Sequence, residues 1–436
     1  ARVSPTDDVT PVLLAAAERG TVIVVQPNAA ERPVLAGRLR REGLTVAMLP
    51  DDWALAAAGC DVVLGGRSAV WAPADEAAAI VVLDEHDDAL QEERTPTWHA
   101  RDVAIERARR RGVPCLLVSP CPTVTALAWS GSRWVRPSHA VERDGWPIVQ
   151  IVDRTDEEPW KRSLLTSPLI ALLRDHDRRV VCVHNTPGRA RLLACRSCRA
   201  LVECEQCAAA VQQVDEGSLH CRRCGTDRPP VCQRCGSSAL ANVRPGVARL
   251  REELEAAANR PVVAVTGETG DVPDAGVYVG TEAVLHRVRL ADDVAFLDID
   301  AELLAPRYRA AEHAMALLVR AARLVGPRTA GGRVLVQTFS PEHDVLQAAV
   351  LADPGRLAKV EAGRRRMLGL PPFAALARVS GEGSGAFVAA TGLAAAADGD
   401  GYLLRAGSWD ELGPRLAATP RPKGSRLRIE VDPARR

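Results

Sequence analysis

Residues 195–235 read CRSCRALVECEQCAAAVQQVDEGSLHCRRCGTDRPPVCQRC, and this stretch decides the fold of the segment around it. It holds four Cys-x-x-Cys pairs, Cys195/Cys198, Cys204/Cys207, Cys221/Cys224 and Cys232/Cys235. A Cys-x-x-Cys turn presents two sulfurs on one tight loop, and zinc prefers four tetrahedral ligands, often thiolates. Eight thiols complete two Cys₄ sites with no open position. We therefore predict two closed zinc sites that hold structure and do not activate water.

The spacing leaves three ways to pair these turns: sequential, interleaved or nested. A nested arrangement would place Cys204, Cys207, Cys221 and Cys224 around an inner zinc, and Cys195, Cys198, Cys232 and Cys235 around an outer one. We expect His220 to be a surface histidine, because the thiols already complete both sites. The segment is too short for a hydrophobic core of its own, so its folding should depend on metal.

The zinc segment is also rich in arginine. Its arginines include Arg196, Arg199, Arg222, Arg223, Arg228 and Arg234. This positive charge fits either a solvated surface or contact with DNA phosphates or a protein partner.

On both sides of this segment, short apolar strands alternate with helical patterns. We predict strands at 21–25, 61–64, 80–83, 114–118, 180–183, 262–265, 277–279, 296–299 and 333–338, and helices at 31–41, 101–111, 164–173, 247–258 and 310–324. This alternation indicates α/β lobes whose parallel sheets are covered on both faces. The stretch 130–159, rich in Pro and Trp, is expected to connect the lobes. After residue 341, a charged helix at 357–366 and strands at 375–379 and 427–431 indicate a small α+β domain.

The expected domains follow from this pattern. They are residues 1–135 for a first lobe, 136–193 for a linker and the start of a second lobe, 194–238 for the zinc module, 239–340 for the rest of the second lobe, and 341–436 for the C-terminal α+β domain.

Composition excludes some classes of protein. The chain has 436 residues, 47% of them hydrophobic, so several sizeable cores are possible. The net charge is +1, which gives no global basic signal for nucleic acid. The longest apolar runs are too short to span a bilayer, and we find no secretory leader, so we expect a soluble intracellular protein. Four scattered cysteines (Cys60, Cys115, Cys121 and Cys182) are expected to be small buried hydrophobes.

A nucleotide-driven motor would need a phosphate loop, Gly-x-x-x-x-Gly-Lys-[Ser/Thr], whose lysine reaches the phosphates. Lysine occurs only at Lys161, Lys359 and Lys423, and none of them is followed by Ser or Thr. We therefore expect no ATP hydrolysis by the usual chemistry within this chain. The acidic stretch at 84–88 is either a magnesium site or a solvated turn after a strand, and we favour the turn.

Several further stretches share a pattern with one family. They are Gly66-Arg67-Ser68-Ala69 with Ala72-Pro73, His99-Ala100-Arg101-Asp102, Pro306-x-Tyr308-Arg309-Ala310-Ala311-Glu312, Gln337-Thr338-Phe339-x-Pro341-x-His343, Leu368-Gly369-x-Pro371-Pro372-Phe373 and Val431-Asp432-Pro433. The cysteine pairs are separated by five, thirteen and seven residues. In order and spacing, these features resemble the replication-restart helicase family of primosomal protein N′ (PriA), across almost the whole chain.

The chain departs from the family at the residues that handle nucleotide. The phosphate-loop Lys-Thr of the family falls within Ser4-Pro5-Thr6, and Leu83 replaces the magnesium-binding Asp. Gly-Thr-Gln becomes Gly280-Thr281-Glu282, and the two arginines that stabilise transition-state charge become Leu324 and Pro327. The family's N-terminal DNA-end-binding and winged-helix domains would lie before residue 1, so we expect a fragment.

The resemblance implies two RecA-like helicase lobes with parallel sheets, an inserted two-zinc Cys₈ module and a small α+β C-terminal domain. It implies a cytoplasmic, nucleoid-associated primosome protein that binds forked or single-stranded DNA. Its other partners would be primosome proteins and the single-stranded-DNA-binding protein, and it would help to reload the replicative helicase. Because of the departures, we expect a scaffold without helicase activity, in which Arg67 and Thr281 contact DNA. The alternatives are an active ATP-dependent 3′–5′ DNA helicase of the primosome and a zinc-stabilised protein-interaction module.

Overall fold

The computed structural model describes residues 1–129, 133–156, 164–185, 193–213, 217–221, 223–242, 247–265, 271–422 and 426–433. Lys161, Lys423 and Arg222, singled out above, lie outside these residues. The chain divides into two compact units. The first contains residues 1–3, 7–136 and the described residues from 358 to 433, and the second contains residues 4–6 and 137–357. The four boundaries between the domains expected from the sequence stay predictions.

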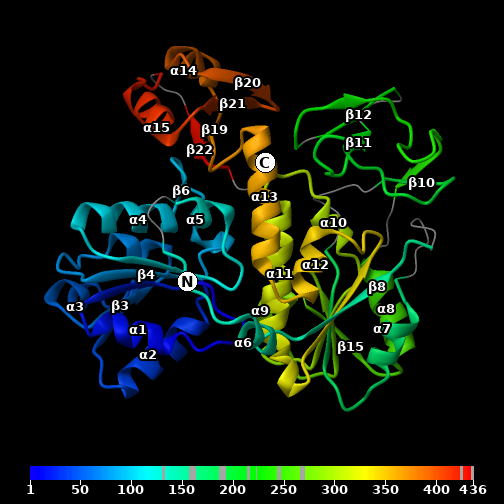
Figure 1. Ribbon diagram of the computed structural model, residues 1–436, viewed down its shortest axis with the longest axis horizontal. Coiled ribbons are helices and arrows are strands. Elements are labelled where there is room, and N and C mark those ends of the chain that lie inside the picture. The colour runs from blue at the N-terminus through cyan, green and yellow to red at the C-terminus, as the bar shows by residue number, and fades with distance from the viewer. Residues whose placement is uncertain are drawn as a thin grey trace. The chain divides into compact units, whose positions relative to one another are not determined.

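The first unit contains a five-stranded parallel sheet in the order β2-β3-β1-β4-β7. Its strands are β1 (Val22–Val25), β2 (Val46–Met48), β3 (Val62–Gly65), β4 (Ala79–Leu83) and β7 (Cys115–Val118). Every residue of β1, β3 and β4 is buried, because helices cover both faces of the sheet. This explains why these strands are continuous apolar runs and not alternating patterns (Figure 1).

Two sets of helices make the two cores of this sheet. Leu13 of α1 (Thr10–Ala17) and Leu39 of α2 (Glu31–Arg41) pack on one face. Ala104 of α4 (Ala100–Arg111) and Ala126 of α5 (Val124–Ala128) pack on the other. Further elements of this unit are α3 (Trp53–Ala58), the 3₁₀ turns η1 (Arg67–Trp71) and η2 (Asp88–Leu90), and the short hairpin of β5 (Gln91–Glu92) and β6 (Trp98–His99).

A four-stranded antiparallel sheet, in the order β20-β21-β19-β22, forms the C-terminal part of the first unit. Its elements are β19 (Ala375–Ser380), α14 (Ser384–Thr391), β20 (Ala394–Asp398), β21 (Gly401–Ala406), α15 (Trp409–Ala418) and β22 (Arg428–Val431). Phe387, Leu404 and Leu412 are at the centre of its core. The small α+β domain predicted from the sequence is therefore present, with two strands and two helices that the sequence pattern did not reveal.

The second unit is built on a six-stranded parallel sheet in the order β15-β16-β9-β17-β18-β8. Its strands are β8 (Ile148–Asp153), β9 (Val180–Val183), β15 (Val262–Val265), β16 (Val277–Gly280), β17 (Asp293–Phe296) and β18 (Arg333–Thr338). The α/β class with parallel sheets, expected from the sequence, is therefore confirmed.

Helices again cover both faces of this sheet (Figure 1). Those of the second unit are α6 (His139–Asp144), α7 (Ser167–Leu173), α8 (Val247–Ala258), α9 (Val284–Arg287), α10 (Asp300–Leu303), α11 (Ala310–Val325), the 3₁₀ turn η3 (Arg328–Ala330) and α12 (Asp344–Val350). Helices α7 and α8 share a core with β9 and β16, centred on Leu169, Leu254 and Cys182. The chain passes into the first unit within α13 (Pro354–Leu368).

Two details of the sequence prediction are wrong. The strand predicted at 296–299 is β17, which begins at Asp293 and ends at Phe296, and Ile299 already precedes helix α10. The stretch 130–159, expected to be a connection, contains the edge strand β8, which pairs along its whole length with β18. Among the residues that the structure describes, no helix has both the length and the apolar character needed to cross a membrane.

Candidate metal centres and nucleic-acid contacts

Each of the four Cys-x-x-Cys pairs adopts the same local turn. The backbone N–H of the residue after the second cysteine donates to the carbonyl of the first, at 2.8–2.9 Å, in all four turns. That donor residue has a positive φ each time: Arg199 67°, Ala208 54°, Gly225 77° and Gly236 75°. The following residue's carbonyl accepts from the N–H of the first cysteine, again at 2.8–2.9 Å. A left-handed residue therefore closes each loop and turns both sulfurs to one side, even where it carries a side chain.

The structure brings the eight sulfurs together in two groups of four. One group is Cys195, Cys198, Cys232 and Cys235, and the other is Cys204, Cys207, Cys221 and Cys224, with the sulfurs of each group within 4.8 Å of one another. Of the three arrangements that the spacing allows, the structure has the nested one. We call the first group the outer cluster and the second the inner cluster.

The distances between sulfurs fit a metal ion and not a disulfide. The separations are 3.5 Å for Cys195–Cys235, 3.4 Å for Cys198–Cys232 and 3.4 Å for Cys204–Cys224. A disulfide would need about 2.05 Å. A tetrahedron with Zn–S bonds of about 2.3 Å has S···S edges of roughly 3.8 Å. These separations are a little shorter than such an edge and far longer than a disulfide, and all four sulfurs of each cluster lie within 4.8 Å of one another.

A metal requires thiolates, and the surroundings favour the thiolate at one sulfur of each cluster, Cys195 and Cys221. Burial opposes ionisation of Cys195, but backbone hydrogen bonds from Cys198 and Ser197 lower its pKa to about 6. In the inner cluster, the hydrogen bond from the Cys207 thiol lowers the pKa of Cys221 to about 5. The same bond raises the pKa of Cys207, because one proton is shared between two close sulfurs.

Short β ladders determine which pairs meet. Strands β10 (Leu193–Cys195) and β14 (Leu240–Asn242) pair antiparallel, and Cys195 lies opposite Leu240. This ladder brings the first and last turns together at the base of the module. The inner turns flank a three-stranded sheet of β11 (Gln212–Gln213), β12 (Leu219–His220) and β13 (Asp227–Arg228). The ring of His220 pairs with Asp227 at 2.7 Å, as a surface histidine would, and belongs to neither cluster.

The inner cluster contacts the rest of the second unit directly. The N–H of Ala210 donates to the carbonyl of Leu304 at 2.6 Å. The Arg223 guanidinium donates to the carbonyls of Cys207 and Tyr308, at 3.4 and 3.3 Å. Ala210, Leu304 and Tyr308 are all almost fully buried, so these bonds lie in a water-poor contact.

Of the two residues expected to contact DNA, Thr281 lies at the carboxyl edge of the six-stranded sheet. It follows the last residue of β16, and its carbonyl accepts from the N–H of Val284. Parallel α/β sheets bind ligands at this edge. Next to it, the His184 N–H donates to the Gly280 carbonyl at 2.8 Å. The His184 ring is buried, both ring nitrogens lack a hydrogen-bond partner among the described residues, and desolvation lowers its pKa.

The other acidic and polar groups at this edge were not found by sequence reasoning. Asp300 accepts from the Thr338 hydroxyl at 2.7 Å and from the Phe339 N–H at 2.9 Å. Burial, aided by the charge of Asp298, nevertheless raises the pKa of Asp300 to about 7. The sequence did contain one signal for this residue, since a carboxylate a few residues after a central strand lies at the carboxyl edge of the sheet.

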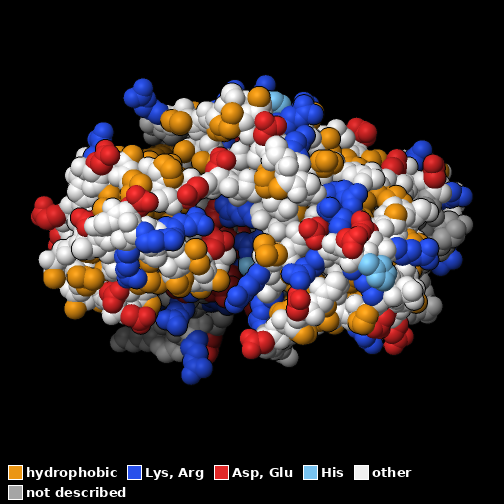
Figure 2. Space-filling view, turned by 90° about the horizontal axis from the view of Figure 1, so that it is seen from below, with side chains coloured by type: hydrophobic (Ala, Val, Ile, Leu, Met, Phe, Trp, Pro, Cys, Tyr) orange, Lys and Arg blue, Asp and Glu red, His pale blue; other side chains and the backbone are white. Residues whose placement is uncertain are grey.

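Arg67, the second expected contact, lies in η1 of the first unit. Its side chain is 42% exposed and pairs with Glu92 at 3.2 Å, so it is accessible but already has an anionic partner. Figure 2 shows, on one face of the molecule, Lys and Arg side chains scattered among Asp and Glu side chains, which agrees with the net charge of +1. The electrostatic attraction for nucleic acid would therefore come from local contacts.

The acidic stretch after β4 has a structural role. Glu85 is 1% exposed and pairs with the equally buried Arg101 at 3.2 Å. It also accepts from the N–H and hydroxyl of Thr123, at 2.7 and 2.9 Å. His86 is hydrogen-bonded to the Ser119 hydroxyl at 2.8 Å. These partners occupy Glu85, which argues against a magnesium site there.

Residues 4–6, where the phosphate-loop Lys-Thr would fall, pack against their own unit. Ser4 is buried and donates to the Glu142 carbonyl at 3.4 Å, while Thr6 donates to the Gly145 carbonyl at 3.0 Å. Arg323 donates to the Pro5 carbonyl at 3.0 Å. A Cβ on Gly145 would lie 2.4 Å from that of Ser4, so the two segments are in close contact.

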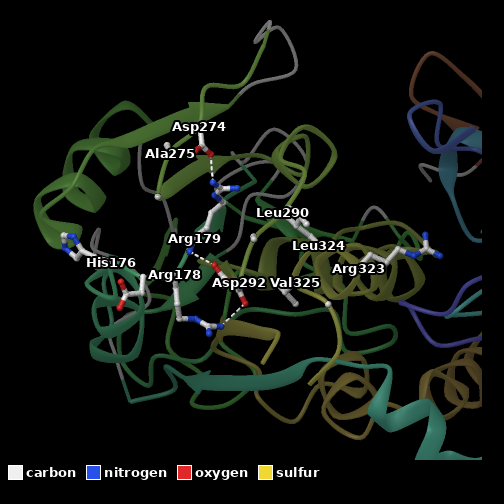
Figure 3. Close-up of a pocket in the computed structure, with 14 residues that line it drawn as sticks. His176, Arg178, Arg179, Asp274, Ala275, Leu290, Asp292, Arg323, Leu324 and Val325 are labelled. Atoms are coloured by element: carbon white, nitrogen blue, oxygen red, sulfur yellow. Dashed lines mark hydrogen bonds and ion pairs between the residues drawn. The ribbon is translucent and has the colours of Figure 1, made fainter. Parts of the chain in front are cut away.

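A hollow of about 810 Å³ lies at the amino ends of β9, β16 and β17 (Figure 3). Thr281 follows the carboxyl end of β16, so it lies at the other end of these strands. Two of its acidic side chains already have partners: Asp274 pairs with the Arg179 guanidinium, and Asp292 accepts from the backbone N–H of Arg179 at 2.7 Å. Leu324, at the position of a missing arginine, also lines it. Self-paired charges at the amino ends of strands indicate a structural network, because parallel sheets bind ligands at the other edge.

Comparison with known proteins gives a consistent set of relatives, although no protein-family model matches the chain. It is 34% identical over 349 residues to a probable replication restart protein PriA of Mycobacterium tuberculosis (strain CDC 1551 / Oshkosh), covering 73% of this chain and 52% of that protein. It is 27% identical over 345 residues to the replication restart protein PriA of Bacillus subtilis, covering 73% and 43%. The relative from Thermotoga maritima is 27% identical over 352 residues, covering 76% and 47%.

The chain thus spans about half the length of the curated relatives that it matches. Among solved structures, the helicase Lhr of Mycobacterium smegmatis bound to ssDNA and AMP-PNP is similar with a TM-score of 0.38 and 12% identity, over 81% of this chain and 46% of that one. A likeness this weak adds nothing to the assignment of fold or function.

Proposed function

Because this chain belongs to the PriA-like family of replication restart proteins, we propose that it binds branched or forked DNA and helps to reload the replicative helicase. We propose that it does so as a scaffold, without helicase activity of its own. Its parallel sheets would be two RecA-like lobes, and its partners would be single-stranded DNA, other primosome proteins and the single-stranded-DNA-binding protein.

The observation that carries the scaffold proposal is the packing of residues 4–6. A phosphate loop must leave its backbone N–H groups and its lysine open to the phosphates. Here Ser4 and Thr6 bond to the segment of Glu142 and Gly145, and none of the three residues is a lysine. The replacement of the magnesium-binding Asp by the buried Leu83 supports the same conclusion.

We propose that zinc occupies both cysteine clusters. A Zn²⁺ ion bound by four thiolates cross-links two distant turns and supplies folding free energy to a segment with little hydrophobic core. The eight thiols fill the coordination sphere of both ions, so neither centre would offer a position for water or substrate. The role of the module would therefore be structural, and its exposed Arg196 and Arg234 would meet DNA or a partner protein.

We propose Arg67 and Thr281 as contacts to the DNA backbone. A salt titration of binding to a forked DNA tests this, because each phosphate contact adds to the slope of log affinity against log salt, about 0.7–0.9 per contact. Arg67→Met should reduce the slope by about one contact. Arg109→Met, which removes an exposed arginine that pairs with Glu106, is the matched control and should leave the slope unchanged. Binding without salt dependence would contradict the proposal.

ATP hydrolysis by the zinc-loaded protein, with and without forked DNA, decides between the scaffold and an active helicase. We expect turnover at background in a preparation that still binds the fork. Robust hydrolysis stimulated by DNA would show that an unrecognised nucleotide site is at work. Failure to bind any DNA, with binding of a primosome protein intact, would favour the third possibility, a protein-interaction module.

A further inference from the structure

The Thr281 turn is held by a closed ring of polar contacts in the second unit, made of two hydrogen bonds and two ion-pair contacts. The Asn185 carbonyl oxygen accepts from the Glu282 N–H at 2.8 Å, and its amide nitrogen donates to Glu302 at 2.9 Å. His313 closes the ring, with its Nε2 3.3 Å from Glu282 and 3.5 Å from Glu302. Glu302 is 4% exposed, so the ring lies in a low-dielectric place where its bonds are strong.

The same ring is connected to the inner cysteine cluster. Arg307 pairs with Glu302 at 2.6 Å and is itself 7% exposed. Arg307 belongs to the segment between Leu304 and Tyr308, whose two end carbonyls accept the bonds from Ala210 and Arg223 of the inner cluster. A continuous chain of short contacts therefore leads from the Cys207 turn to the N–H of Glu282, one residue after Thr281.

Within the part of the chain that the structure describes, we find no such connection for the outer cluster. Its contact with the sheet runs from Arg199 to the carbonyl of Asp156, beyond the end of β8. Strand β8 is the far edge of the sheet, and three strands separate it from β16. The two clusters therefore differ in what they support.

We propose that Asn185 and Glu302 are positioning residues that fix the Thr281 turn for contact with nucleic acid, and that the inner cluster supports them through the 304–308 segment. This inference rests on the proposed role of Thr281 in DNA binding. Two of the contacts, Ala210 to Leu304 and Arg307 to Glu302, are short and join almost fully buried residues. Loss of the inner metal therefore loosens the turn, because the Leu304 and Tyr308 carbonyls lose their fixed donors. Loss of the outer metal loosens the base of the module and leaves the turn in place.

Two arginines of the module provide a matched test. Arg223 donates to Cys207 and to Tyr308 outside the module, while Arg228 donates to Glu203 and Val231, both within the module. Arg223→Met and Arg228→Met each remove two bonds to carbonyls and keep most of the side-chain volume. The measurements on each full-length variant are zinc content, hydrogen exchange of the peptide that contains Glu282, and affinity for a single-stranded oligonucleotide.

We expect both variants to retain two zinc ions. In Arg223→Met, exchange at the turn should be about tenfold faster and DNA affinity several-fold weaker, as for the loss of one buried hydrogen bond. In Arg228→Met, both should be unchanged. Asn185→Ala should reproduce the Arg223→Met result, without any change at the metal clusters.

The outcomes distinguish this inference from the proposal that Thr281 contacts DNA. Unchanged exchange at the turn in Arg223→Met, with zinc retained, would overturn the connection between cluster and turn. Faster exchange with undiminished DNA affinity would uphold the connection and overturn the contact of Thr281 with DNA. Equal effects of Arg223→Met and Arg228→Met would show a general loosening of the module and would also overturn the inference.

Discussion

The buried pair of Glu85 and Arg101 offers the sharpest test of the structural role assigned to the acidic stretch after β4. Both side chains are 1% exposed, and their charged atoms are 3.2 Å apart. We consider Glu85→Gln, which keeps the shape of the side chain and an acceptor for Thr123 but removes the charge. The change leaves the Arg101 guanidinium buried without its full counter-charge.

The expected cost follows from that uncompensated charge. Removal of one partner of a buried ion pair costs about 3–5 kcal/mol. Arg101 keeps a bond to Asp102 at 3.0 Å, but that carboxylate is half exposed and screened by water, so it offsets little. In a unit of this size, each kcal/mol of lost stability lowers the unfolding temperature by about 2–4 °C. A loss of about 3–5 kcal/mol should therefore lower the unfolding temperature of the first unit by roughly 6–20 °C.

Urea unfolding of the purified zinc-loaded protein, monitored by tryptophan fluorescence, measures this cost. The double variant Glu85→Gln, Arg101→Met should recover part of the loss, because the charge left unpaired is then gone. Glu106→Gln is the control, since Glu106 pairs with Arg109 and Arg110 on the exposed face of α4 and its loss should change stability little.

Two results would refute this reasoning. A loss below about 1 kcal/mol in Glu85→Gln would mean that the pair contributes no more than a surface salt bridge. A rise in the unfolding temperature of the unaltered protein with added magnesium, abolished by Glu85→Gln, would show that Glu85 binds a cation, and would restore the magnesium site that the ion pair argues against.

Three further predictions follow from single sites. By elemental analysis, the protein and His220→Ala should each contain two equivalents of zinc, and Cys198→Ser should retain one. Removal of zinc by a chelator should speed hydrogen exchange across 193–213 and 223–242 but not in β9 or β16. Burial raises the pKa of Asp300 from 3.8 to about 7, so between these pH values the folded state keeps a proton that the unfolded state has lost. Stability should therefore fall as pH rises from about 4 to about 7. Urea unfolding between about pH 5.5 and 7.5 should show a flatter dependence of stability on pH in Asp300→Asn than in the unaltered protein. Arg378→Met should cost about 1–3 kcal/mol in thermal unfolding of the first unit, because Arg378 is 5% exposed and pairs with Asp398, Asp400 and Glu430; a loss no greater than that of an exposed arginine would contradict this.

The central strands could be predicted from the sequence because their residues are apolar on both faces. Strand β9 is an example: it was predicted with the bounds that the structure has, Val180–Val183. Strand β17 shows where this rule fails. It begins with Asp293, which is fully buried and paired with Arg178 and Arg333 at 2.6 and 2.8 Å. In the sequence, an isolated acidic residue favours a loop. Asp293 belongs to a strand because Arg178 and Arg333, at the ends of two neighbouring strands, compensate its buried charge.

The edge strand β8 was not predicted from the sequence for a different reason. In β8, the side chains of Ile148, Gln150 and Asp153 are exposed or partly exposed, and the strand pairs on one side only. Such a segment lacks the continuous apolar run of a central parallel strand. Its assignment depends on β18, which lies nearly two hundred residues later in the sequence. Local pattern therefore cannot distinguish it from a connection.

The metal centres also show that sequence pattern predicts residue types better than it predicts which segments meet in space. The residue types and the Cys-x-x-Cys spacing sufficed to predict all eight sulfurs of the two clusters. Which turns meet was open, because spacing along the chain does not determine distances in space. The antiparallel ladder of β10 and β14 decides it, since it places Cys195 next to the turn of Cys235. Short ladders of this kind have no apolar pattern that sequence reading could detect.

Structural contacts are also present at three places that the resemblance assigns to the handling of nucleotide. Residues 4–6 bond to the segment around Gly145, Glu85 is occupied by Arg101, and Leu83 is part of an apolar core. Restoring one of these positions would therefore break a contact without restoring a site. Leu83→Asp, for example, would bury a carboxylate among Val22, Val24 and Val81. We expect this variant to be destabilised by several kcal/mol in urea unfolding and to gain no affinity for Mg²⁺-ATP, and tight nucleotide binding by it would contradict the scaffold proposal.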